Sequence, residues 1–280
     1  MAPLGIIAGL GDLPVQVAAA ATERGQGVYV LRLKGFEEPA LEPYPGEVAG
    51  IAQLGKAFKA FKSAGCEQIC FAGIVKRPDF QALKPDMKGI SLLPKAIAAA
   101  RQGDDALLRF LIDVFESEGF KVIGADEAAQ SLTVEAGLMA GPDPSEDQLA
   151  DLKKAAEIAL QMGQLDIGQG AIVANGLVLC VEAQEGTDQM LQRCAMLPQQ
   201  IRGTSEARRG VLVKRPKPQQ ERRIDLPTIG LNTIELAAEA GLAGIGYEAD
   251  GALMLNGDQI CARANELGLF LYGFSKDWTP

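Results

Sequence analysis

Three acidic residues in the second half of the chain stand where carboxylates could take part in catalysis. Glu182 ends a predicted strand, Asp188 follows a Gly-Thr pair, and Asp225 comes just after a basic stretch. Together with Lys214 and Lys217 they supply oxygen ligands for Mg²⁺ and cations for phosphate, which are the components of metal-assisted phosphoryl chemistry. Taken alone, each acid is better explained as a helix cap or a surface residue.

The chain of 280 residues contains no histidine, and this narrows the chemistry further. A Ser-His-Asp triad, an imidazole base and a His-ligated zinc ion are all excluded. Catalysis must therefore use carboxylates, lysine, arginine, hydroxyls, backbone dipoles or a metal bound by oxygen. We expect Mg²⁺, with Mn²⁺ as a substitute, because oxygen ligands favour these ions.

The net charge of −9 argues against nucleic acid as a partner, because nucleic-acid binding requires many cations against phosphate. Eight Lys and Arg residues nevertheless lie between Arg202 and Arg223, with two glutamates among them. This stretch is either a focused site for a phosphorylated ligand or a solvated loop, and the composition favours neither.

A glycine turn, Gly9–Pro14, lies between a predicted strand at Leu4–Ala8 and a predicted helix at Pro14–Arg24. Glycines in such a turn let the backbone approach a phosphate at the helix N-terminus. A dinucleotide motif would have a third glycine where Pro14 stands and an acid where the second strand ends at Lys34. A nicotinamide cofactor is disfavoured, and the remaining alternatives are another nucleotide or phosphate, or a tight turn without a ligand.

Lys76 and Arg77 follow another predicted strand, Gln68–Gly73. The carboxyl ends of strands form the ligand crevice of an open α/β sheet, so these cations could contact phosphate oxygens. The alternative is an ordinary exposed loop.

Strands that alternate with helices over the first half, one of the helices around Leu92–Arg101, predict an α/β fold with a parallel, Rossmann-like sheet. The "GPDPSED" run predicts the exit from this domain, with Ser145 or Asp147 capping a helix over Gln148–Met162. Asn175-Gly176 then predicts a hairpin, so the second domain should be mixed α/β. We predict domains at residues 1–135 and 136–280.

Five cysteines form no CxxC pair, and most lie in apolar runs, so we interpret them as buried apolar residues in a reducing cytosol. No apolar run is long enough to span a bilayer, and the N-terminus does not resemble a signal peptide. We predict a cytoplasmic protein, with peripheral contact at the inner membrane still compatible with the sequence.

Several long strings, "GQGAIVANGLVLCVEAQEGTDQMLQRC", "VLVKRPKPQQERRIDLPTIG" and "GIIAGLGDLP", resemble the LpxI family of UDP-2,3-diacylglucosamine pyrophosphatases. The resemblance extends over essentially the whole chain. It implies an N-terminal UDP-binding domain, a C-terminal catalytic and lipid-binding domain, and an active site between them. It also implies Mg²⁺-dependent hydrolysis to UMP and 2,3-diacylglucosamine 1-phosphate (lipid X) in lipid A biosynthesis.

The same resemblance assigns roles by motif. It implies catalytic roles for Asp225, Lys214 and Lys217, and metal binding by Asp225 and Glu182. It implies contacts to the substrate from Gly11, Asp12, Lys76, Gln169, Asn175, Thr187 and Asp188. Thr187 also has the residue type and position of a helix N-cap. The oligomeric state is left open, and a homo-oligomer is compatible with the sequence.

Two other classes of function remain as alternatives. The first glycine turn is compatible with a nicotinamide-dependent oxidoreductase, although Pro14 and Lys34 argue against it. A non-catalytic nucleotide sensor is the second alternative, and the acids and lysines of the second domain argue against it.

Overall fold

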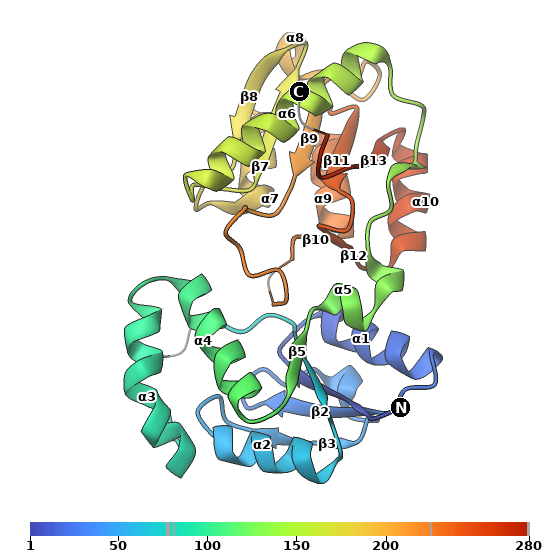
Figure 1. The fold of residues 1–280 in the computed structure, drawn as a ribbon. Coiled ribbons are helices and arrows are strands. Elements are labelled where there is room, and N and C mark those ends of the chain that lie inside the picture. Colours follow the sequence, from blue (N-terminus) through green and yellow to red (C-terminus); the bar gives the residue numbers. More distant parts are fainter. Residues whose placement is uncertain (77–78, 81, 225, 279–280) are drawn as a thin grey trace. The chain divides into compact units, whose positions relative to one another are not determined.

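A computed structural model describes residues 1–76, 79–80, 82–224 and 226–278 (Figure 1). The chain divides into two compact units. Among the described residues, the first unit comprises 1–131 and the short segment 221–224, and the second comprises 132–220 and 226–278. The segment 221–224 therefore belongs to the first unit, although the chain on both sides of it belongs to the second.

The first unit is built on a five-stranded sheet in the order β3-β2-β1-β4-β5, and all its pairs are parallel. Its strands are β1 (Leu4–Ala8), β2 (Val28–Leu33), β3 (Gly46–Ala49), β4 (Gln68–Ala72) and β5 (Lys121–Ile123). This order places β1 beside β4 at the point where the winding reverses. The predicted parallel α/β sheet is confirmed.

Helices cover both faces of this sheet (Figure 1). They are α1 (Asp12–Glu23), α2 (Leu54–Ser63), α3 (Met87–Ala100), α4 (Asp104–Ser117) and α5 (Ala125–Ala128), with a 3₁₀ turn η1 (Pro39–Leu41). Phe58 and Phe61 of α2 and Phe115 of α4 form the core of one face. The helices α1 and α5 pack against the opposite face.

Helix α3 begins earlier than the sequence predicted. The prediction placed a helix near Leu92–Arg101, whereas α3 starts at Met87. Asp86 is its N-cap, because the Asp86 carboxylate accepts a hydrogen bond from the Gly89 N–H at 2.8 Å. Pro94 lies inside the helix, where it is less favourable than in a first turn.

The second unit contains a six-stranded mixed sheet in the order β6-β13-β11-β9-β7-β8. Its strands are β6 (Gly137–Ala140), β7 (Gly170–Ala174), β8 (Leu177–Val181), β9 (Val211–Lys214), β11 (Gly244–Glu248) and β13 (Phe270–Phe274). The strands β9, β11 and β13 are parallel, and β6 and β7 pair with them antiparallel. The predicted mixed domain and the β7–β8 hairpin are confirmed.

Helix α6 (Glu146–Gln164) covers one face of this sheet through Leu152, Ala155 and Ala159. Ser145 caps α6 in a capping box with Gln148, as predicted. The other face is covered by α7 (Gly186–Ala195), α9 (Leu231–Glu239) and α10 (Gly257–Leu267). The remaining elements are α8 (Gln199–Arg202), η2 (Gln130–Leu132) and the small parallel pair β10 (Thr228–Ile229) and β12 (Leu253–Met254).

The interpretation of the cysteines as buried apolar residues is confirmed for four of the five, and Cys261 is partly exposed. Burial raises the pKa of the Cys66 thiol to about 11, and burial is also the main cause that raises the pKa of Cys70 to about 12. Among the described residues, none of the helices combines the length and apolar character needed to cross a bilayer.

A buried carboxylate fixes the turn between β7 and β8. Asn175 and Gly176 adopt positive φ angles of 51° and 74°, as a type I′ hairpin turn requires. Asp151 of α6 accepts hydrogen bonds from both of their N–H groups, at 2.8 and 2.7 Å. Because Asp151 is only 4% exposed, this contact ties the hairpin firmly to α6.

Replacing Asp151 with Ala should lower the free energy of unfolding by about 1–3 kcal/mol, because two N–H groups lose a charged acceptor. Gln161→Ala, on an exposed position of the same helix, should change it by less than about 0.5 kcal/mol. Chemical denaturation of both variants measures the difference. Equal stabilities would show that Asp151 does not clamp the turn.

Candidate active site

A glycine separates two buried charged residues at one end of the second sheet. Gly170 of β7 lies opposite Lys214 of β9, and its carbonyl accepts the N–H of Glu182 at 2.9 Å. Residues that face each other on antiparallel strands project from the same side of the sheet. Glu182 and Lys214 therefore lie on either side of a position without a side chain, and their exposures are 6% and 7%.

The Glu182 carboxylate is only partly satisfied by hydrogen bonds. Its Oε1 accepts a hydrogen bond from the Thr187 hydroxyl at 3.2 Å, while its Oε2 is buried and has no hydrogen-bond partner among the described residues. A Cβ on Gly170 would lie 2.4 Å from this Oε2, so only glycine leaves it room. Burial raises the pKa of the Glu182 carboxyl above its usual value, and the Lys214 ammonium partly offsets this rise.

Thr187 is not a helix cap, contrary to the prediction. The N-cap of α7 is Glu185, and Thr187 lies within the first turn of the helix. Its hydroxyl is directed to Glu182, because the chain turns back so that the start of α7 packs on the end of β8. Thr187 therefore belongs to the same cluster as Glu182. The family resemblance had predicted both as site residues, Thr187 as a substrate contact and Glu182 as a metal ligand.

Glu182, Gly170 and Lys214 form a row across neighbouring strands, and Tyr247 extends this row on the far side of Lys214. Tyr247 was not among the residues predicted from the sequence. It lies beside Lys214 in the parallel β9–β11 pair, and it is completely buried. Its hydroxyl has no hydrogen-bond partner among the described residues, and burial raises its pKa. A buried tyrosine hydroxyl normally has a partner, so this one is available to a ligand group or a water molecule.

Gln169 adjoins the row through the backbone. Its carbonyl accepts the N–H of Arg215 at 3.0 Å, which continues the pairing of β7 with β9 beyond the strand end. The side-chain Oε1 of Gln169 is also buried without a hydrogen-bond donor among the described residues. Gln169 precedes Gly170 in the sequence, and Glu182 lies beside Gly170 across the sheet. Two buried acceptors therefore lie next to Gly170.

Arg215, the residue after Lys214, forms a buried ion pair on the α6 side of the sheet. Its Nη2 lies 2.8 Å from Oε2 of Glu248, and the two side chains are 4% and 1% exposed. Its Nη1 also donates to the Ala156 carbonyl at 3.3 Å. This pair fixes the ends of β9 and β11 next to each other and so holds Lys214 in place.

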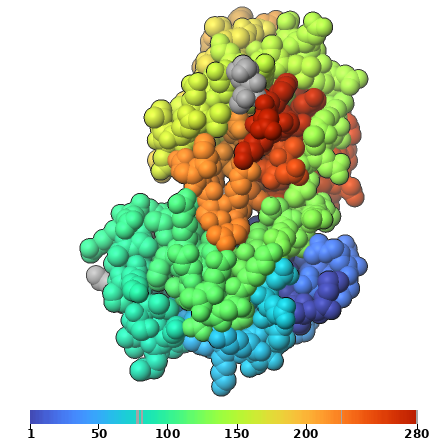
Figure 2. All heavy atoms as spheres, viewed as in Figure 1, coloured from blue at the N-terminus to red at the C-terminus, as the bar shows by residue number. Residues whose placement is uncertain are grey.

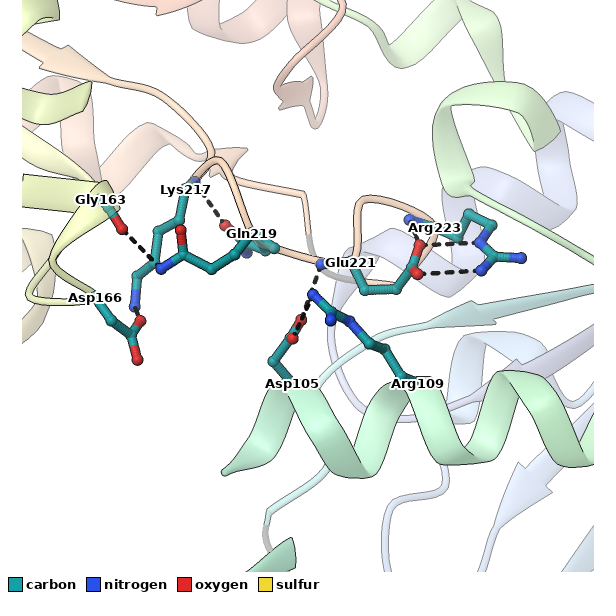
Figure 3. Close-up of polar contacts among 9 residues, drawn as sticks. Asp105, Arg109, Gly163, Asp166, Lys217, Gln219, Glu221 and Arg223 are labelled. Carbon is teal, nitrogen blue, oxygen red and sulfur yellow. Dashed lines mark hydrogen bonds and ion pairs between the residues drawn. The ribbon is translucent and has the colours of Figure 1, made fainter. Parts of the chain in front are cut away.

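Lys217 lies just beyond this row in the second unit. Its Nζ is 2.7 Å from Oδ1 of Asp166, and Gln219 donates to the Gly163 carbonyl at 2.8 Å (Figure 3). Lys217 also contributes to the electrostatic environment of Glu182, where it lowers the carboxyl pKa. The structure therefore brings Gln169, Glu182, Thr187, Lys214 and Lys217 into one region.

Residues 221–224 are anchored within the first unit. The Glu221 N–H donates to Asp105 at 2.9 Å, and Arg223 pairs with Glu221 (Figure 3). Arg223 also pairs with Glu116 of α4. Ile224 packs against the aromatic core of the first unit. The predicted catalytic residue Asp225 follows directly and lies outside the described residues.

Most cations of the basic stretch are hydrogen-bonded within the protein. Six of its eight cations donate to the protein's own carbonyl or carboxylate oxygens, and these are Arg202, Arg208, Arg209, Arg215, Lys217 and Arg223. Most of its positive charge therefore stabilises the fold and the connections around the strand ends.

Two predicted substrate residues, Asn175 and Asp188, have hydrogen-bond partners outside this row. Asn175 is in the β7–β8 turn, at the opposite end of β7 from Gly170, where its backbone is held by Asp151. Asp188 accepts a hydrogen bond from Asn232 of α9 at 2.7 Å. The hydrogen bonds of these two residues are therefore made to Asp151 and Asn232 and not to Glu182.

In the first unit, Gly11, Asp12 and Lys76 lie at the carboxyl ends of β1 and β4. Gly11 has a φ of 95°, and Asp12 begins α1. The chain after β1 bridges to the chain after β4 through Leu10 and Ile74, and Lys76 follows as an exposed residue. This is the switch point at which doubly wound sheets bind ligands.

Glu38 is a further residue at this switch point that the sequence analysis missed. Its carboxylate accepts the Gly11 N–H at 3.1 Å. It stands a few residues after β2, where dinucleotide-binding sheets carry an acid, but it is displaced into the following loop.

The oxygen ligands available among the described residues of the second unit are few, which is compatible with Mg²⁺. No group of three or more acidic or cysteine residues with a metal-binding arrangement occurs within the described ranges. Mg²⁺ usually keeps several waters and takes only one or two carboxylates, so it does not need such a group. The unpartnered Oε2 of Glu182 fits a magnesium ligand of this kind.

The first α/β unit has a doubly wound parallel sheet, and the second has a buried polar row at its strand ends. The chain is therefore a two-domain α/β protein with enzyme-like sites. Residues 3–132 match the LpxI N-terminal domain, and residues 135–272 match the LpxI C-terminal domain. The chain belongs to the LpxI family, as its motifs predicted.

The chain is also 51% identical, over 280 residues, to the UDP-2,3-diacylglucosamine pyrophosphatase LpxI of Caulobacter vibrioides. The match covers 100% of both chains. No segment of that relative is therefore left without a counterpart in this chain.

Replacing Glu248 with Ala should lower the free energy of unfolding by about 3–5 kcal/mol, because Arg215 is left as a buried charge without its partner. The exposed pair Arg263–Glu235 is the matched control, and Glu235→Ala should cost less than about 1 kcal/mol. The joint replacement Arg215→Met with Glu248→Leu should recover most of the loss. Similar costs for Glu248→Ala and Glu235→Ala in urea denaturation would contradict this account.

Proposed function

We propose that this protein hydrolyses the pyrophosphate bond of UDP-2,3-diacylglucosamine in lipid A biosynthesis, with Mg²⁺ and at the cytosolic side of the membrane. The products are UMP and 2,3-diacylglucosamine 1-phosphate. The observation that carries the proposal is the full-length 51% identity to a relative named for this activity. The buried row in the second unit supports it with a chemistry suited to phosphate.

The first unit is proposed to bind the UDP portion. Phosphate oxygens at the switch point would meet the N-terminus of α1 near Gly11 and Asp12, where backbone N–H groups carry partial positive charge. Lys76 would add a full positive charge from the end of β4. Glu38, which already accepts a backbone N–H there, would accept a hydrogen bond from a ribose hydroxyl.

In the second unit, Lys214 and Lys217 are proposed to offset the charge of the diphosphate. Lys214 is buried, so its charge acts in a low-dielectric environment and is worth more than on the surface. The Tyr247 hydroxyl can donate to a phosphate oxygen from the next strand. The remaining proposed substrate residues are Gln169, Asn175, Thr187 and Asp188. Of these, Gln169 and Thr187 lie beside the row.

In the proposed reaction, a water oxygen bonds to the α-phosphorus of UDP. The bond from that phosphorus to the bridging oxygen breaks, and this oxygen leaves with the sugar 1-phosphate. Glu182 and Asp225 are proposed to hold Mg²⁺ (or Mn²⁺), which when bound would neutralise charge on the diphosphate. Asp225 is also proposed to orient the water, since a carboxylate is the simplest base in a chain without histidine.

The direct test is incubation with UDP-2,3-diacylglucosamine and Mg²⁺, with release of UMP as the readout. We expect UMP in the presence of Mg²⁺ and none in excess EDTA. Absence of UMP with every divalent ion would overturn the proposed function. Hydrolysis in ¹⁸O-labelled water should place the label in UMP, and label in the sugar phosphate would contradict attack at the α-phosphorus.

Glu182→Gln should lower turnover by at least about tenfold, because it removes a buried charge aimed at the reacting groups. Glu185→Gln is the matched control, since Glu185 lies three residues later and pairs with Arg193 at the surface. Its turnover should remain close to that of the unaltered protein. Equal turnover of the two variants would show that Glu182 is not part of the active site.

A further inference from the structure

Helix α3 presents a stripe of apolar side chains to solvent. Met87 is 84% exposed and Ile90 is 55% exposed, and Pro94 and Ala98 are exposed on the following turns. These positions recur at helical spacing, so they share one face. In the space-filling view the α3 segment (teal) lies at the surface (Figure 2).

The opposite face of α3 is closely packed, so the orientation of the stripe is fixed. Gly89 and Ala100 are buried, and the helix packs against α2 and α4 of the same unit. A Cβ on Gly89 would lie 2.0 Å from the Ala52 carbonyl, which shows how closely the first turn approaches the chain before α2. Because packing fixes the opposite face of α3, the apolar side chains of the stripe stay exposed to solvent.

Lysines lie beside this stripe, on α3 and on the neighbouring helix α2. Lys84, Lys88 and Lys95 lie on α3 or just before it, and α2 beside it carries Lys56, Lys59 and Lys62. Glu47 pairs with Lys56, and Glu118 pairs with Lys62 and Lys88, whereas Asp86 accepts hydrogen bonds from backbone N–H groups. The surface is thus positively charged overall, in a chain whose net charge is −9.

A groove of about 550 Å³ separates α2 from α3 within this surface. Its walls include Lys59, Lys62, Lys88 and Glu118. The groove is shallow and open, and its ammonium groups are exposed beside the apolar stripe. Exposed apolar side chains with flanking lysines are the pattern of a helix that lies in the interface of a bilayer.

We propose that α3 and the adjoining lysines of α2 form a surface that docks on an anionic phospholipid bilayer. Met87 and Ile90 enter the headgroup region, and the lysines approach lipid phosphates. The choice of a bilayer rests on the proposed function, because a substrate with two acyl chains resides in a membrane. The net positive charge of this surface, on an acidic protein, selects anionic lipid over zwitterionic lipid.

The test uses the full-length protein and sedimentation with vesicles, without any substrate. Vesicles of phosphatidylcholine with phosphatidylglycerol should bind the protein, and vesicles of phosphatidylcholine alone should bind it much less. Met87→Glu with Ile90→Glu should reduce binding roughly tenfold or more, because two apolar contacts become negative charges. Met196→Glu with Leu165→Glu is the matched control, since these residues are 84% and 70% exposed on the second unit.

The lysine contribution is tested separately. Lys95→Glu should weaken binding about fivefold or more, and raised salt should weaken binding of the unaltered protein. Lys276→Glu, which reverses an exposed charge on the second unit, should leave binding unchanged. Circular dichroism and thermal unfolding confirm that each variant is folded.

Failure of wild-type protein to sediment with anionic vesicles would overturn the docking surface. Equal loss of binding in the α3 and control variants would also overturn it. Hydrolysis of detergent-dispersed substrate, measured in parallel, keeps the two proposals distinct. The α3 variants should retain that activity, whereas failure of the proposed function would abolish UMP release in every variant and leave vesicle binding intact.

Discussion

The pairing of β7 with its two neighbours is the constraint on which the candidate site depends. It places Gly170 between Glu182 and Lys214, so that a buried carboxylate and a buried ammonium share one face of the sheet. Their mutual attraction reduces the cost of burying both charges. The register is held at the other end of β7 by Asp151 and beside Lys214 by the Arg215–Glu248 pair.

Much of the fold could be predicted because its signals are local. The hairpin at Asn175-Gly176, the cap at Ser145 and the parallel sheet of the first unit each follow from a short stretch of sequence. Glu182 and Lys214 were also singled out, since both stand at predicted strand ends. The motifs that resemble the LpxI family provided the substrate, which neither composition nor periodicity could have provided.

Features that depend on contacts between distant residues could not be predicted. Gly170 and Tyr247 matter because of strand register, and no local pattern shows which residues will face Lys214. The side chain of Thr187 turned to Glu182 instead of capping α7, and the cations of the basic stretch found carbonyls and carboxylates across the fold. Helix α3 begins before the predicted Leu92–Arg101 helix, because the Asp86 carboxylate caps its first turn.

The most direct test of the central claim is the turnover of Gly170→Ala, measured as UMP release. The added methyl group would contact the end of the flexible Glu182 side chain, which can move aside and leave the sheet intact. If the row at Glu182, Gly170 and Lys214 is the active site, turnover should fall by at least about tenfold with thermal unfolding nearly unchanged. Normal turnover in a folded Gly170→Ala variant would contradict this account.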